Sequence, residues 1–347
     1  MALKVGIVGL PNVGKSTLFK ALTKHPVDIN NYPFCTIDPN VGVVTVPDKR
    51  LEQLAHMSGS KKVVPAVIEF VDIAGLVKGA SKGEGLGNAF LANIRETDAI
   101  VHVVRTFHNS QITHVDGDVD PRRDRETITT ELMLADMETI GKHCTRLTKL
   151  ARGGDKEALA LLILAEKVQK VLERGEIASS VDMTEEEKPL LRSFGLLTSK
   201  PVIYAFNTND IDKPVEDDLD SSDYVKLDIK MEEELLDMSE EEIQELGIQT
   251  GLHALIQKAY EVLGLMTFLT TGEDESRAWT IKQGSTAPEA GSAIHNDFKD
   301  RFIRAEVISW KELLEIGSWA QAKEKGKIRT QGKDYIVQDG DVMVFKV

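Results

Sequence analysis

The chain has little of several features that would narrow its class at once. Only two of its 347 residues are cysteines, Cys35 and Cys144, which is too few for a disulfide framework or a zinc site. No apolar run approaches the roughly 20 residues that a membrane-spanning helix needs. The N-terminus enters a charged residue and a strand without the pattern of a signal peptide. These absences predict a cytoplasmic protein without a membrane partner.

Acidic side chains outnumber basic ones, 56 to 42, and the distribution of this excess matters. The net charge is −14, but residues 210–261 hold 17 acidic and 4 basic side chains, so this segment carries nearly all of the excess. A protein that coats nucleic acid or binds specific DNA is therefore not expected, since both need an extended positive surface. The rest of the chain is close to neutral, which leaves RNA or a ribosome open as a partner.

The most informative stretch that is present runs from residue 9 to 16, GLPNVGKS, and fits the pattern GxxxxGK[ST]. An apolar segment at 3–8 precedes it with the length of a buried strand, and 17–22 has helical spacing. Strand, glycine loop and helix are the context that a phosphate-binding loop requires. Its N–H groups converge on phosphate oxygens, and the helix N-terminus adds partial positive charge. The nucleotide-binding residues predicted here are Asn12, Val13, Gly14, Lys15, Ser16 and Thr17.

Later stretches follow in the order of a switch-type P-loop NTPase. Thr36, in a loop with two prolines, can complete a Mg²⁺ shell and sense the γ-phosphate. Asp72, at the end of an apolar segment, can hold Mg²⁺ through water, and Gly75 can offer its N–H to the γ-phosphate. Lys15 is predicted to neutralise the β- and γ-phosphates during catalysis, and Ser16 to ligate Mg²⁺. Phosphoryl transfer depends mostly on such positioning and charge neutralisation.

Two departures from the GTPase pattern leave the base and the catalytic group open. The base-reading motif Asn-Lys-x-Asp would lie at 207–210, where Asn207 and Asp210 are kept and Thr208 replaces the lysine. Asn207 and Thr208 are predicted to line the base pocket, with guanine possible and adenine open. The glutamine that usually follows Asp-x-x-Gly is replaced by Leu76, which cannot orient a water molecule.

Two residues are candidates for orienting the attacking water and for supplying positive charge at the phosphates. His114 lies in a polar loop, and its imidazole can bond to the attacking water in either tautomer. The alternative is an ordinary surface histidine. Asn12 can offer its carbonyl oxygen to K⁺ between the phosphates, where it would supply missing positive charge. The alternative is an amide that only stabilises the loop, and both pairs of alternatives stay open.

The hydrophobic patterns predict an α/β protein with an inserted helical pair and a different C-terminal part. Strands are expected at 3–8, 41–46, 63–72, 100–104 and 201–206, and helices at 88–95, 127–150, 156–174, 232–246 and 252–263. A glycine-rich stretch at 76–87 is expected to be mobile. The last part should be a small α+β unit, with strands at 266–269, 277–281, 302–309, 335–337 and 342–346 and one helix near 288–295.

Several motifs together resemble the YchF family, the Obg-like ATPases. They are GLPNVGKST, NYPFCTIDPN, DIAGLVKGASKGEGLG, RAEVISW and GKDYIVQDGDVMVFKV, and the resemblance covers essentially the whole chain. It implies an Obg-type G domain in 1–119 and 199–264, an inserted antiparallel helical pair in 120–198, and a C-terminal β-grasp-like TGS domain in 265–347. It also implies ATP in preference to GTP, His114 as the catalytic histidine, and the ribosome or its subunits as partner.

We therefore predict a Mg²⁺-dependent P-loop ATPase that hydrolyses ATP to ADP and phosphate as a ribosome-associated switch. The switch would be the ordering of Thr36 and residues 76–87 by the γ-phosphate. One alternative is a GTPase of the same fold, which Asp210 keeps open. Another is a ribosome or protein adaptor with a structural nucleotide, which Leu76 favours.

Overall fold

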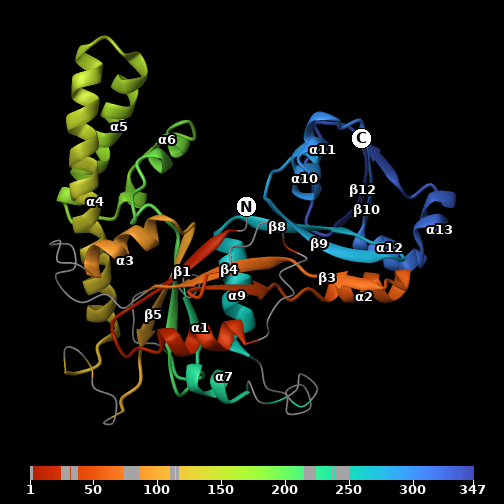
Figure 1. Ribbon diagram of the computed structural model, residues 1–347, viewed down its shortest axis with the longest axis horizontal. Helices are drawn as coiled ribbons and strands as arrows, with labels where there is room; N and C mark the ends of the chain where they lie inside the picture. The colour runs from red at the N-terminus through yellow and green to blue at the C-terminus, as the bar shows by residue number, and fades with distance from the viewer. Residues whose placement is uncertain are drawn as a thin grey trace.

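A computed structural model describes residues 3–24, 32, 38–73, 86–109, 114, 117–214, 224–235, 238, 242 and 250–347. Two six-stranded sheets organise these residues, and a long pair of helices projects from the first sheet (Figure 1). Within these ranges no helix is both long enough and apolar enough to cross a membrane.

The first sheet has the strand order β2-β4-β1-β5-β6-β7. Its strands are β1 (Lys4–Val8), β2 (Val41–Thr45), β4 (Val67–Asp72), β5 (Ala99–Arg105), β6 (Val202–Asn207) and β7 (Tyr224–Leu227). Only β2 is antiparallel to its neighbour, β4. Every residue of β5 is buried, as expected for a central parallel strand with both faces covered. The strands predicted at 3–8, 41–46, 100–104 and 201–206 are confirmed, whereas β7 lies where the sequence predicts no strand.

Helices cover this sheet and complete a P-loop α/β fold. They are α1 (Lys15–Thr23), α3 (Leu86–Arg95), α7 (Ile229–Leu235) and α9 (Gly251–Val262). Leu18 and Leu22 of α1 are buried four residues apart, which gives the helix one apolar face against the sheet. The helix predicted at 232–246 is seen only as α7, and most of its later part lies outside the described residues.

The predicted antiparallel helical pair is present as α4 (Pro121–Arg152) and α5 (Lys156–Glu173). Asp120 and Asp155 cap the two helices by accepting hydrogen bonds from backbone N–H groups of their first turns. The pair has its own apolar core, which the short helix α6 (Glu187–Ser193) helps to close. The chain then returns to β6 of the first sheet.

The second sheet has the order β11-β10-β12-β8-β9-β3 and contains a segment from early in the chain. Its strands are β3 (Lys62–Val64), β8 (Leu265–Thr270), β9 (Glu275–Lys282), β10 (Arg304–Ser309), β11 (Arg329–Gln331) and β12 (Asp341–Lys346). The strand predicted within 63–72 is present as β4, which ends at Asp72, but the sequence does not predict that the same stretch begins with a second strand, β3. The extended segment is interrupted at Pro65, which has no N–H to donate to a neighbouring strand. Strands β3 and β4, on either side of it, belong to different sheets.

The C-terminal prediction needs two further corrections. Residues 335–337 form no strand, because Ile336 makes only an isolated bridge with Thr286. The predicted helix is present as α10 (Ala287–Ile294), but α11 (Asp297–Asp300), α12 (Trp310–Ile316) and α13 (Trp319–Glu324) accompany it. Helices of four to seven residues are too short to show a helical period in the sequence.

Helix α2 (Lys49–Ser58), a further element that the sequence does not predict, joins the two sheets. It packs against β9 and α12, and Figure 1 shows it beneath the second sheet. Arg50 forms an ion pair of 2.5 Å with Asp339, and Leu54 is fully buried in a core shared by both sheets. Residues 49–64 thus lie with the C-terminal sheet in space, while the four-segment domain division at 119, 198 and 264 stays a prediction.

Candidate nucleotide-binding site

In the loop between β1 and α1, two glycine positions leave no room for a side chain. A Cβ atom at Gly9 would lie 2.6 Å from the carbonyl oxygen of Val103. At Gly14, which has φ 106°, a Cβ atom would lie 2.8 Å from Nδ2 of Asn207. Both glycines of the GxxxxGK[ST] pattern are therefore required by close approach of neighbouring strands. The N-terminus of α1, with its unpaired N–H groups, opens from this loop.

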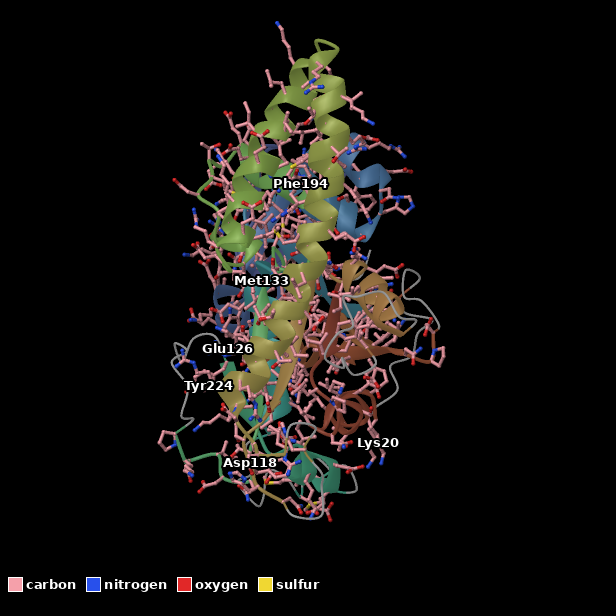
Figure 2. All side chains as sticks on the ribbon, turned by 90° about the vertical axis from the view of Figure 1, so that its left-hand side faces the viewer. Lys20, Asp118, Glu126, Met133, Phe194 and Tyr224 are labelled. Carbon is pink, nitrogen blue, oxygen red and sulfur yellow. The ribbon has the colours of Figure 1, made fainter. Side chains whose placement is uncertain are left out.

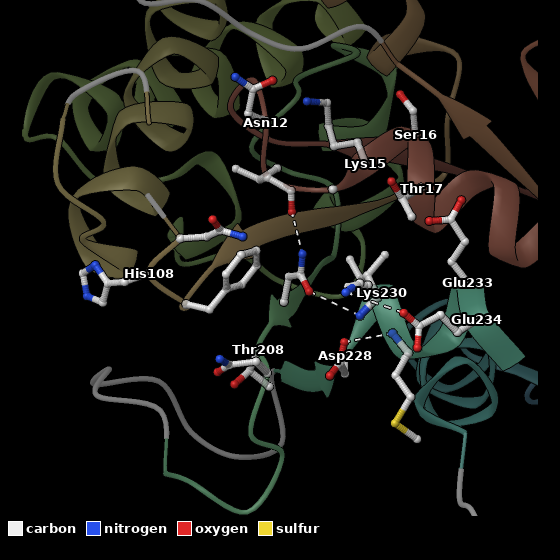
Figure 3. Close-up of a pocket in the computed structure, with 18 residues that line it drawn as sticks. Asn12, Lys15, Ser16, Thr17, His108, Thr208, Asp228, Lys230, Glu233 and Glu234 are labelled. Atoms are coloured by element: carbon white, nitrogen blue, oxygen red, sulfur yellow. Dashed lines mark hydrogen bonds and ion pairs between the residues drawn. The ribbon is translucent and has the colours of Figure 1, made fainter. Parts of the chain in front are cut away.

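Lys15 lies at the start of α1, and its side chain turns back over the loop. Its Nζ donates a hydrogen bond of 2.7 Å to the carbonyl oxygen of Leu10. Burial lowers the pKa of Lys15 to about 8, and the nearby carboxylate of Asp72 opposes this shift. Figure 3 shows the Lys15 ammonium beside Asn12 above the pocket. A cation held in this way is available for phosphate oxygens.

The predicted Mg²⁺ ligands are only partly within the described residues. Ser16 is exposed in the first turn of α1, and Asp72 ends β4 next to Ile7 of β1. A hydroxyl and a carboxylate are hard oxygen ligands of the kind that Mg²⁺ takes beside phosphate oxygens. In the described ranges no three histidine, cysteine or acidic residues form a metal cluster, so the protein supplies no full cage there. Thr36, Gly75 and Leu76 lie outside the described residues.

A pocket of about 760 Å³ extends from the phosphate loop past the carboxyl ends of β5, β6 and β7. It is lined by residues 12–17, 107–109, 207–209 and 228–231, together with Glu233 and Glu234. This is the crevice where doubly wound sheets bind nucleotides. All six predicted residues of the loop, and Asn207 and Thr208, meet here (Figure 3).

Asn207 connects the base side of the pocket to the phosphate loop. Its Nδ2 donates a hydrogen bond of 2.9 Å to the carbonyl oxygen of Val13. Its Oδ1 accepts one of 3.3 Å from the N–H of Ile229. The side chain is buried, so both bonds are shielded from water and keep the loop and the β7–α7 junction together.

Asp210 does not face the pocket, although its spacing from Asn207 leaves guanine open as the base. Its Oδ1 accepts hydrogen bonds from the N–H groups of Asp212 (3.2 Å) and Lys213 (3.3 Å). The residue is exposed and is not among those that line the cavity. The hydroxyl of Thr208 bonds to the backbone of Asp210 and stabilises this turn. In GTPases the carboxylate at this position accepts the guanine donors, and here it is engaged elsewhere.

Two segments line the pocket although no motif in the sequence marks them. Residues 107–109 follow β5, where the buried Arg105 donates hydrogen bonds to the carbonyl oxygens of Phe107 (2.9 Å) and Asn109 (3.3 Å). Residues 228–231 follow β7 and begin α7. Their signal in the sequence is position alone, since each segment follows the carboxyl end of a strand.

His114 lies away from the pocket in this structure. Its Nε2 is 2.8 Å from Oδ2 of Asp124 in the first turn of α4, and both side chains are buried. It is not among the residues that line the cavity. The alternative of a surface histidine is wrong, because only 6% of the residue is exposed. Its role in hydrolysis stays a prediction.

Asn12 is the only described residue other than glycine with a positive φ, 62°. Asparagine tolerates this left-handed conformation better than most residues. The K⁺ role predicted for it is neither supported nor opposed by this geometry.

Comparisons with known proteins agree with the fold. Residues 4–135 match a family model described as 50S ribosome-binding GTPase, and residues 265–347 match the YchF-GTPase C-terminal model, described as a protein of unknown function (DUF933). The chain is 50% identical to the "Ribosome-binding ATPase YchF" of Bacillus subtilis, over 100% of this chain and 99% of the relative. It is 49% identical to the protein of the same name from Escherichia coli O157:H7, over 99% of each. A solved structure of the Schizosaccharomyces pombe YchF GTPase aligns with a TM-score of 0.85 and 38% identity, over 99% of this chain and 97% of that one.

Proposed function

This chain belongs to the YchF family, and we propose that it is a ribosome-associated P-loop ATPase that hydrolyses ATP to ADP and phosphate with Mg²⁺. Relatives named for ribosome binding and ATP hydrolysis support this proposal over the full length of the chain. We choose ATP over GTP because of the orientation of Asp210. Its carboxylate, which would have to accept the guanine donors, is instead bonded to backbone N–H groups outside the pocket.

The residues of the pocket have separate tasks in this reaction. Lys15 and the loop N–H groups bind the β- and γ-phosphates and neutralise the charge that moves toward the leaving oxygen. Ser16 would hold Mg²⁺ directly and Asp72 through water, and the bound ion would supply further positive charge to the phosphates. Asn207 keeps the loop in register with the base side. Thr36 and Gly75 complete the predicted γ-phosphate contacts.

His114 is the proposed group that orients the attacking water. In the present arrangement its Nε2 is bonded to Asp124, so this role requires the ring to leave Asp124 and enter the pocket. Release of His114 from α4 is thus the proposed step that links the helical pair to hydrolysis. The ordering of residues 76–87 by the γ-phosphate remains the proposed switch toward the ribosome, and the cytoplasmic location and the K⁺ role of Asn12 remain predictions.

Calorimetric titrations with ATP and GTP test the choice of nucleotide. We expect ATP to bind at least tenfold more tightly than GTP, with and without K⁺. Asp210→Asn should leave both affinities within about twofold, because its carboxylate does not line the pocket. Asn207→Ala, the matched control on the same strand end, should weaken both nucleotides. An affinity for GTP far above that for ATP would contradict the proposal and favour the GTPase alternative.

Ribosome pelleting tests the switch against the adaptor alternative. Wild type should bind ribosomes differently with a non-hydrolysable ATP analogue and with ADP. Lys15→Ala should remove this difference, since it cannot hold the γ-phosphate. Binding that is the same in every nucleotide state, for wild type and variant alike, would support the adaptor.

A further inference from the structure

The helical pair α4 and α5 forms an arm whose free end lies away from both sheets (Figure 1). Helix α4 has 32 residues, which corresponds to about 48 Å at the rise of an α-helix. In Figure 2 the arm rises from Glu126, near the first sheet, past Met133 and Phe194 to this free end. The apolar core between the helices, which includes Leu147 and Ala158, extends to the last turns. This core therefore keeps the two helices packed together at the end of the arm, where they position the side chains at its surface.

Four exposed cations gather at this end, and we call them the distal cluster. They are Arg146, Lys149 and Arg152 of α4 and Lys156 of α5. At 100° per residue the three on α4 lie on the side opposite Leu147 and Ala151, which pack toward α5. The outer face of the last two turns is thus positively charged.

Several cations closer to the body are ion-paired, whereas among the described residues no member of the distal cluster is. Three such pairs are Lys142–Glu138 (2.5 Å), Lys167–Glu187 (2.8 Å) and Lys188–Glu185 (2.5 Å). In the described part of the chain no member of the distal cluster has a carboxylate within ion-pair distance. Arg146 donates only to Nδ1 of His143, at 3.3 Å. The nearby Asp155 carboxylate is occupied by the N–H groups of Glu157 and Ala158.

Helix stability accounts for only part of this arrangement. Lys149 and Arg152 lie in the last turn of α4, where a cation is favourable to the helix dipole. Lys156, however, is the first residue of α5, where a positive charge is unfavourable. Leu150, in the midst of these cations, leaves 47% of its surface exposed to water. The cluster concentrates positive charge in a protein whose net charge is −14.

We infer that the distal cluster is a contact site for the phosphate backbone of ribosomal RNA. This inference rests on the proposed ribosome association and names the chemistry of one contact. Four cations that face solvent at the end of a projecting arm fit a polyanion, and each phosphate that they bind releases counterions. The local patch also allows an acidic protein to approach RNA with one end, while the acidic helix α7 lies at the other end of the molecule (Figure 1).

The test compares two fourfold variants of the full-length protein with equal changes in net charge. The first is R146Q/K149Q/R152Q/K156Q, and the control is K142Q/K167Q/R174Q/K188Q, which removes ion-paired cations of the same helical region. Binding to purified ribosomes is measured by pelleting at several KCl concentrations. We expect the distal variant to bind at least tenfold more weakly at low salt. The slope of log K against log[KCl] should become shallower by roughly 3, because each phosphate that is no longer bound accounts for about 0.7–0.9. The control should stay within about threefold.

A second measurement separates this inference from the proposed function. Filter binding to deproteinised ribosomal RNA should show the same weakening for the distal variant, and basal ATP turnover and the far-UV spectrum should not change. Wild-type affinity and salt slope in the distal variant would overturn the inference. Weaker binding to ribosomes but not to RNA would also overturn it, in favour of an acidic protein partner. If wild type binds no ribosomes, the proposed function fails, and equal RNA binding by wild type and variant would then overturn the inference independently.

Discussion

Lys15 shows how one residue can be specified by a motif and yet tuned by its surroundings. The motif predicts a lysine at the phosphates, but only the fold places its Nζ 2.7 Å from the carbonyl oxygen of Leu10 and buries it. The folded pKa of about 8 lies below the ordinary value of 10.5 for a lysine side chain in water. The folded protein therefore binds fewer protons than the unfolded chain between these values, and the free energy of unfolding should rise with pH in this window.

The pH dependence of ATP binding should report this lysine. Below pH about 8 Lys15 is charged before the nucleotide arrives, and above it each pH unit should cost up to about tenfold in affinity. Calorimetry between pH 7.5 and 9.5 measures this effect. Lys15→Met should bind about 100-fold more weakly or worse, without that pH dependence. A flat wild-type profile over the range would contradict the expectation.

Asp124 provides a second prediction at the scale of the residue. If His114 must leave α4 to orient water, Asp124→Ala should raise basal ATP turnover several-fold, because the bond at 2.8 Å no longer holds the ring. His114→Ala should lower turnover at least tenfold, and the double variant should match it. Steady-state turnover is measured beside a melting curve that confirms folding. A slower Asp124→Ala enzyme would mean that the carboxylate assists the histidine in the reaction.

The candidate site shows which residues sequence can identify. Asn12, Gly14, Ser16 and the other loop residues lie in the pocket, because a contiguous motif carries its own geometry. The spacing of Asp210 from Asn207 suggests a base contact, but its carboxylate bonds to its own turn. The direction of a side chain after a strand depends on local hydrogen bonds that spacing does not encode. Residues 107–109 escape prediction for the same reason.

Among the elements, the junction between the helical pair and the first sheet depends on one buried carboxylate. Asp136 of α4 is fully buried, and it accepts hydrogen bonds from the N–H groups of Leu197 (2.7 Å) and Thr198 (2.8 Å) and from the Thr198 hydroxyl (2.6 Å). These bonds fix the chain where it returns toward β6. Burial raises the pKa of Asp136, and the bonds to Thr198 and Leu197 oppose this shift.

Removing this carboxylate should loosen the arm. Asp136→Ala leaves three buried donors without their acceptor, and we expect a decrease of about 2–4 kcal/mol in the free energy of unfolding. Urea denaturation measures the decrease, and hydrogen exchange should rise first at Leu197 and Thr198. Asp182→Ala, at an exposed position of the same region, is the control and should change stability by less than about 0.5 kcal/mol. Equal stability of the two variants would contradict the anchoring role.

At the scale of the whole molecule, the two sheets form one packed body. The shared core includes Leu54 of α2, Ile68 of the first sheet and Leu269 of the second. Strand β3 adds an edge to the second sheet by pairing with β9. The C-terminal unit predicted at 265–347 thus relies on residues from near position 60, which are about 200 positions earlier in the chain.

Leu54→Ala should weaken both sheets together. The side chain is fully buried, and the cavity should cost about 3 kcal/mol. Hydrogen exchange should speed up in β8 and β9 as well as in β4, since the core is continuous. Leu134→Ala, at a position 49% exposed, is the control and should leave both sheets unchanged. An effect confined to one sheet would show that the two unfold independently.

Features that are encoded within one segment of the chain can be predicted from its residues. The phosphate loop, the long helices of the arm and the central buried strands each carry their signal within one segment, and all are present in the structure. The pairing of β3 with β9, the bond between His114 and Asp124 and the direction of the Asp210 carboxylate could be seen only in the folded chain. The strand pairing depends on contacts between segments far apart in the chain. The direction of the Asp210 carboxylate depends on which nearby N–H groups it accepts hydrogen bonds from. Neither the long-range contacts nor the choice of local hydrogen bonds produces a periodic pattern or a residue spacing that can be recognised in the sequence.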